Sequence, residues 1–113
     1  MPIVAEARAV YVQWMGTIET EILIAEIAVR TEAAIELVLL RVEKESNDWR
    51  RAAYRNLANN LASYKAALLE GRLCTPGAGL GWGAGKAISE WGLDDSEMSA
   101  AVELAEGLYR DGR

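Results

Sequence analysis

Apolar residues recur along most of this chain at intervals of three and four positions, and no segment alternates with the two-residue period of a strand. Intervals of three and four are typical of helices that pack one side against other helices. The pattern therefore predicts an all-α fold, a compact helical bundle of four to five helices with one long central helix and a Gly-rich loop. At 113 residues the chain is expected to form a single helical domain, residues 1–113.

Two helical segments are expected before residue 46. The first covers about Ile3–Met15 and the second about Thr17–Glu45, and Gly16 between them either interrupts the helix or bends it. The second segment has one apolar face close to a seven-residue repeat and another apolar stripe on a different side. The face is Ile24, Ile27, Ile35, Val38 and Val42, and the stripe is Ile18, Ile22 and Val29. Such a helix is either the spine of a bundle or leaves part of its surface free for another chain.

The next helix is expected to begin at Asn47-Asp48, because Asn and Asp are favoured N-caps, and to end at Gly71, a favoured residue just beyond a helix. Its apolar positions are separated by three or four residues throughout, which predicts an amphipathic helix packed on one side. These positions are Tyr54, Leu57, Leu61, Tyr64 and Leu68.

A glycine-rich segment follows at residues 74–86, and its composition predicts a loop. A phosphate-binding Walker loop is excluded, because Leu80 stands where its first glycine belongs and Ala87 follows Lys86. A dinucleotide fingerprint would need a preceding strand, and none is predicted. We interpret the segment as a flexible hinge. Trp82 within it is expected to dock on this chain or on a partner.

Two helices are expected after the loop. The first runs from about Ala84 to Trp91 and stops at Gly92. The last begins near Asp94, because Asp94 and Glu97 have the spacing of a capping box, and it ends near Arg110. The residues expected to point inward from it are Met98, Val102, Ala105 and Leu108.

The residue types present exclude most catalytic chemistry. The chain has no histidine, which removes the usual catalytic triads, zinc fingers and metalloprotease motifs. Cys74 has no imidazole to activate it and is interpreted as a passive loop thiol. The acids of the long helix suggest a solvated face, with Glu26 and Arg30 spaced as a surface ion pair. We therefore expect no enzyme activity, no cofactor and no metal.

Charge and cysteine content bear on location. A single cysteine allows no internal disulfide, which fits a reducing cytoplasmic setting. The first residues lack a basic region followed by an apolar run, so no signal peptide is predicted. The most apolar stretch, residues 22–40, contains four charged residues and is expected to be a soluble helix rather than a membrane span. The net charge of −5 argues against nonspecific binding to nucleic acid or anionic membranes.

The basic residues gather in one region. From Trp49 to Arg72 there are five basic residues and a single acid, which leaves a net charge of −9 on the rest of the chain. Arginine and asparagine on one side of a helix suit phosphate oxygens and base edges, and a tryptophan can stack on a base. Two alternatives are that these residues pair with the protein's own glutamates or meet an acidic protein partner. The candidate nucleic-acid-binding residues are Trp49, Arg50, Arg51, Arg55, Asn59 and Lys65.

The stretch Trp49-Arg50-Arg51-Ala52-Ala53-Tyr54-Arg55-Asn56-Leu57, in an all-helical chain of this size, resembles the small subunits of CRISPR ribonucleoprotein effector complexes. In that family a short helical protein lines the belly of a larger assembly and braces the target strand. The resemblance implies a role without catalysis, with protein subunits and nucleic acid as partners.

Two functions are therefore expected to compete. The first is a non-catalytic small helical subunit of a larger complex, in its sharper form a nucleoprotein whose basic helix contacts the nucleic-acid backbone. The alternative is a free-standing helical homo-oligomer that acts as a protein-binding adaptor, regulator or inhibitor. In that case the face from Ile24 to Val42 would be the self-interface.

Overall fold

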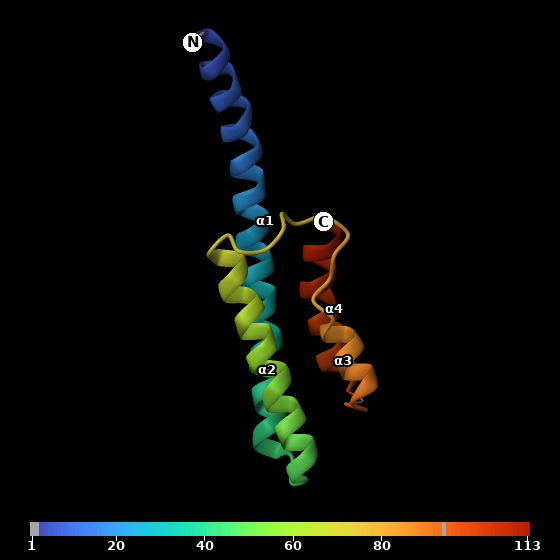
Figure 1. Ribbon diagram of the computed structural model, residues 1–113. Helices are drawn as coiled ribbons and strands as arrows, with labels where there is room; N and C mark the ends of the chain where they lie inside the picture. The colour runs from blue at the N-terminus through green and yellow to red at the C-terminus, as the bar shows by residue number, and fades with distance from the viewer. Residues whose placement is uncertain (1–2, 94) are drawn as a thin grey trace.

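The computed structural model describes residues 3–93 and 95–113, and the side chains of residues 18–93 and 95–113. Within these ranges the chain is helical and contains no strand, which confirms the all-α prediction (Figure 1). The helices are α1 (Ile3–Lys44), α2 (Asp48–Leu69), α3 (Ala84–Glu90) and α4 (Ser96–Asp111).

Helix α1 is one continuous helix of 42 residues. It runs through Gly16, so the two segments expected before residue 46 are a single element. A glycine inside a helix costs only about 1 kcal/mol, which good helix-forming neighbours can offset. At about 1.5 Å per residue, 42 residues measure roughly 63 Å. Helix α1 therefore accounts for the long dimension of the molecule, which is 65 Å against 19 and 17 Å.

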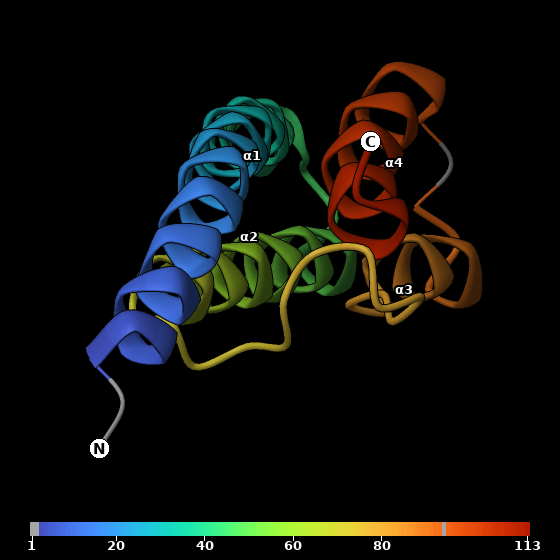
Figure 2. The same cartoon turned by 90° about the horizontal axis from the view of Figure 1, so that it is seen from above.

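Helices α1 and α2 form an antiparallel hairpin, and α4 packs against α1 beside it. Helix α3 packs against α4 and α2 on the outside of this group (Figure 2). The N-terminal part of α1, drawn in blue, continues past the ends of α2 and α4 (Figure 1). The bundle therefore covers only the C-terminal part of its longest helix.

The core lies where α1, α2 and α4 meet. Helix α1 contributes Ile27, Ile35 and Val38, all buried, with Ile24 and Val42 partly buried at the edges. The stripe predicted on α2 is buried except for Tyr64, which is partly buried. Of the residues expected to point inward from α4, Met98, Val102 and Ala105 are buried and Leu108 is partly buried. The predicted inward faces are thus confirmed. The face of α1 that was a candidate self-interface is occupied by the protein's own helices.

The turn between α1 and α2 follows the predicted capping chemistry. The Asn47 side chain accepts a hydrogen bond from the backbone N–H of Arg50 at 2.9 Å, which confirms Asn47 as the N-cap of α2. At the other end Gly71 takes a positive φ of 72°, the conformation that favours glycine just beyond a helix.

The start of α4 differs from the prediction. Asp95 is the N-cap, and its side chain accepts a hydrogen bond from the backbone N–H of Met98 at 2.9 Å. Asp94 lies outside the described residues. Asp95 also forms an ion pair with Arg41 of α1, a contact between residues 54 positions apart. Asp94 and Asp95 are equally good caps by composition, so the sequence alone does not distinguish them.

None of the described helices combines the length and the apolarity that a bilayer crossing requires.

Candidate functional site

The glycine-rich segment carries a buried tryptophan, Trp82. Trp82 is buried between Tyr64 of α2 and Tyr109 of α4, with ring centroids 5.4 and 5.1 Å away and interplanar angles of 10° and 28°. Stacked aromatic pairs of this kind stabilise a core beyond the area that they bury. Of the two docking places predicted for Trp82, the structure has the one on its own chain.

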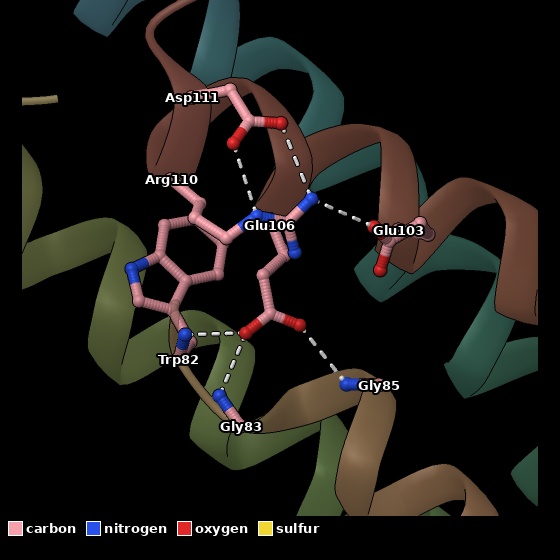
Figure 3. A network of polar contacts seen from close by, with 7 residues as sticks. All are labelled: Trp82, Gly83, Gly85, Glu103, Glu106, Arg110 and Asp111. Atoms are coloured by element: carbon pink, nitrogen blue, oxygen red, sulfur yellow. Dashed lines mark hydrogen bonds and ion pairs between the residues drawn. The ribbon is translucent and has the colours of Figure 1, made fainter. Parts of the chain in front are cut away.

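Glu106 of α4 fixes the end of this segment. Its buried carboxylate accepts backbone hydrogen bonds from Trp82, from Gly83 at 2.7 Å and from Gly85 at 3.0 Å (Figure 3). These N–H groups surround the first turn of α3, whose N-cap residue has no capping side chain of its own. A carboxylate from another helix therefore supplies the cap and the negative charge that a helix start favours.

Two glycines make this arrangement possible. Gly83 has a φ of 75°, which residues with a Cβ rarely adopt. A Cβ at Gly81 would lie 2.8 Å from a carboxylate oxygen of Glu106. We refer to Trp82, Glu106 and these two glycines as the Trp82 junction.

The glycine-rich segment is also held at its middle. The backbone N–H groups of Gly77 and Gly79 donate to the carbonyls of Tyr109 and Arg110 at 2.8 and 2.9 Å. The Tyr109 hydroxyl donates to the carbonyl of Cys74 at 2.9 Å. A segment interpreted as a flexible hinge is thus attached to α4 at several points, and its chemistry serves the fold.

Two of the predicted nucleic-acid-binding residues are engaged within the chain. The Arg51 guanidinium donates twice to the backbone carbonyl of Glu45, at 3.0 and 2.8 Å, and so closes the α1–α2 turn. The Lys65 ammonium pairs with Glu32 of α1 at 2.8 Å. Pairing with the protein's own helix was the alternative explanation of the basic residues, and it holds for Lys65.

The other four predicted residues are exposed. Trp49, Arg50, Arg55 and Asn59 all lie on the surface of α2. No acidic side chain among the described residues lies within ion-pair distance of Arg50 or Arg55. Trp49 is 63% exposed and lines a shallow hollow of about 250 Å³ together with Asn56 and Trp91. Trp91 was not singled out as a candidate site residue from the sequence. The sequence showed only that it precedes Gly92 at the end of a short helix, which does not predict its position beside Trp49.

Helix α1 has a second apolar surface that faces away from the core. Ile22 and Val29 are 66% and 68% exposed, and Ile18 and Ala25 are exposed as well. Their spacing of four, three and four residues places all four within about 60° around the helix. We call these four residues the outer stripe. Three of them were noticed as a separate stripe in the sequence, and the structure leaves that stripe uncovered.

Acidic residues border the outer stripe on both sides. Glu19 and Glu26 lie on one side of it, Glu21 lies on the other, and all three are exposed. Glu26 also forms the predicted surface ion pair with Arg30, at 3.3 Å. The stripe is therefore an apolar strip with negative edges, on the helix that extends beyond the bundle.

In the part of the chain with described side chains, no three acidic or cysteine residues are close enough together to hold a metal ion. Comparison of the sequence with models of known families and with curated proteins gives no match, and neither does comparison with solved structures.

Proposed function

We propose that this protein is a non-catalytic helical subunit that binds other proteins through the outer stripe of α1. The observation that carries the proposal is the exposure of Ile22 and Val29, at 66% and 68%, on the side of α1 opposite the core. Single exposed apolar residues are ordinary on a protein surface. A row of four at helical spacing is typical of a surface that another protein covers.

The length of α1 supports the same function. The bundle packs only against its C-terminal part, and the N-terminal part continues past α2 and α4 (Figure 1). A helix outside its own bundle gains nothing from tertiary packing, which is the main source of helix stability in proteins. A partner along α1 would supply that packing.

The test is the native mass of the tagged protein purified from its own host. We expect a particle much larger than the 12.3 kDa chain. Replacing two stripe residues with a polar helix former, Ile22→Gln with Val29→Gln, should return it to the mass of the isolated protein. Leu104→Gln, which removes an exposed leucine from α4, is the matched control and should leave the large particle intact. Wild-type protein that purifies as a single chain would contradict the proposal.

A second candidate is the nucleoprotein subunit to which the resemblance of the Trp49–Leu57 stretch points. It is supported by the exposure of Trp49, Arg50 and Arg55 on one helix. Its test is the binding of labelled single-stranded nucleic acid by Arg50→Glu with Arg55→Glu. Arg51 is left unchanged, because its contact with Glu45 makes an Arg51 variant a test of the fold. Unchanged binding by the double variant would remove this candidate.

A further inference from the structure

We infer that the partner of the outer stripe is a basic amphipathic helix, bound alongside α1 as in a two-stranded coiled coil. The inference rests on the proposed function and specifies the chemistry of the partner. It follows from three properties of α1, namely the spacing of its stripe, the charge at its edges and the occupation of its other face.

The spacing fits a partner helix. Ile18, Ile22, Ala25 and Val29 alternate intervals of four and three residues, the a and d pattern of a coiled coil. Tyr11 and Met15 continue the same intervals toward the N-terminus in the sequence, and their side chains lie outside the described ones. The seam runs along one helix and is straight and narrow, a shape that a second helix complements.

The edges of the seam disfavour pairing with a second copy of the same surface. In coiled-coil terms Glu19 and Glu26 occupy e positions and Glu21 occupies a g position. A parallel pair of identical seams would bring Glu21 of one copy near Glu26 of the other. An antiparallel pair would bring e positions together and g positions together, again acid against acid. Like charges at these positions oppose pairing, so the seam favours a partner with basic edges.

Among the described side chains of α1, the other large exposed apolar residues are Leu39 and Leu40. Glu32 and Glu36, at the intervening d and a positions, separate them from the outer stripe. Ile27, Ile35 and Val38 on the opposite side are buried against α2 and α4. Glu32 toward the α2 side is paired with Lys65. Among its described side chains, α1 therefore has one run of a and d positions that is both apolar and negatively bordered.

The binding probe is a pair of synthetic helical peptides of about three heptads, identical in their leucines at a and d. One has lysine at every e and g position and the other has glutamate. We expect the lysine peptide to bind the wild-type protein about ten-fold or more tightly than the glutamate peptide, with an affinity that falls as salt is added. Fluorescence anisotropy of labelled peptide measures the affinity.

Two protein variants test whether the lysine peptide binds through the apolar seam or through charge attraction alone. Ile22→Gln with Val29→Gln keeps every charge and should lower affinity for the lysine peptide by about ten-fold or more. Glu19→Lys with Glu21→Lys keeps the apolar seam and should reverse the preference toward the glutamate peptide. Leu104→Gln should bind as the wild type does. Circular dichroism of each variant, recorded beforehand, should give the wild-type melting curve.

Three results would overturn the inference. The first is equal binding of both peptides, and the second is full binding of the lysine peptide by the Ile22→Gln, Val29→Gln variant. The third is a wild-type dimer in sedimentation velocity that this variant abolishes, which would make a second copy the occupant. If the native complex depends on the stripe while the lysine peptide fails to bind, the proposed function stands and the inference about the partner is wrong.

Discussion

Trp82 and Ile22 are both large apolar side chains, yet Trp82 is 6% exposed and Ile22 is 66% exposed. Around Trp82, two aromatic rings cover the indole, and a buried carboxylate accepts hydrogen bonds from the neighbouring backbone N–H groups. Around Ile22, the neighbouring carboxylates are exposed and the apolar surface is uncovered. The protein itself covers the first region, although the buried indole N–H of Trp82 lacks a hydrogen-bond partner, whereas the apolar side chains of the second region are left uncovered. The difference assigns the Trp82 junction to the stability of the fold and supports the proposal that the outer stripe binds a partner.

A large loss of stability is expected when the Trp82 indole is removed. Trp82→Ala should lower the free energy of unfolding by about 3–5 kcal/mol, because it removes a buried ring from between Tyr64 and Tyr109. Urea denaturation followed by circular dichroism measures the change. Trp49→Ala is the control, and its exposed ring should change the free energy by less than about 0.5 kcal/mol. Equal effects of the two variants would contradict the assigned role of the junction.

A smaller loss is expected at the carboxylate. Glu106→Gln keeps the shape of the side chain but places an amide where three backbone N–H groups need an acceptor. Leaving a buried donor without an acceptor costs about 1–3 kcal/mol, and the free energy of unfolding should fall by about that amount. Glu103→Gln, one turn earlier and exposed, should leave it nearly unchanged. If the two variants have the same free energy of unfolding, the Glu106 cap does not stabilise the fold.

The start of α4 predicts a pH dependence. The hydrogen bond from Arg41, and then that from the Met98 backbone, lower the pKa of Asp95 below its ordinary value of 3.8. A lowered pKa means that the folded state favours the carboxylate. The stabilisation is therefore present above pH 3.8 and is lost as the pH falls through the lower folded value. Losing an N-cap costs about 1 kcal/mol. Asp95→Asn, which retains a cap but does not titrate, should weaken this pH dependence in urea melts. An unchanged dependence would refute the assignment.

The smallest effect on stability is expected at the outer stripe. Ile22→Gln with Val29→Gln should change the free energy of unfolding of the isolated protein by about 0.5 kcal/mol or less, because both side chains are mostly exposed. Ile35→Asp, on the buried side of the same helix, should prevent folding. Thermal melts of the two variants measure how much each side of α1 contributes to stability. A large loss from the stripe variant would mean that the stripe packs within the chain.

Periodicity was sufficient to predict most helices and their inward sides. The stripe from Tyr54 to Leu68 is local information, because each position needs only its neighbours three and four residues away. The Asn47 cap and the Gly71 terminus are equally local. The all-α fold and the packed face of α2 therefore follow from the sequence without knowledge of the tertiary structure.

The contacts that determine what each of these residues does join positions far apart in the sequence. The periodicity of apolar residues cannot predict them. Glu103 and Glu106 are alike in the sequence, and only the docking of residue 82, 24 positions away, makes Glu106 a cap. Arg51 resembles Arg55 in the same way, yet it alone reaches the carbonyl of Glu45. The two apolar sides of α1 were both visible, and which one faces the core depends on where α2 and α4 lie.

The enclosure of Trp82 has an optical consequence. An indole held between two phenol rings and shielded from water should emit at shorter wavelengths than the exposed indole of Trp49, and the adjacent Tyr64 and Tyr109 should transfer excitation energy to it. Separation of α3 and α4 from the hairpin would shift this emission to longer wavelengths. A partner bound along the outer stripe would leave it unchanged. In a variant with Trp82 as its single tryptophan, this emission would distinguish unfolding of the bundle from binding along the projecting helix.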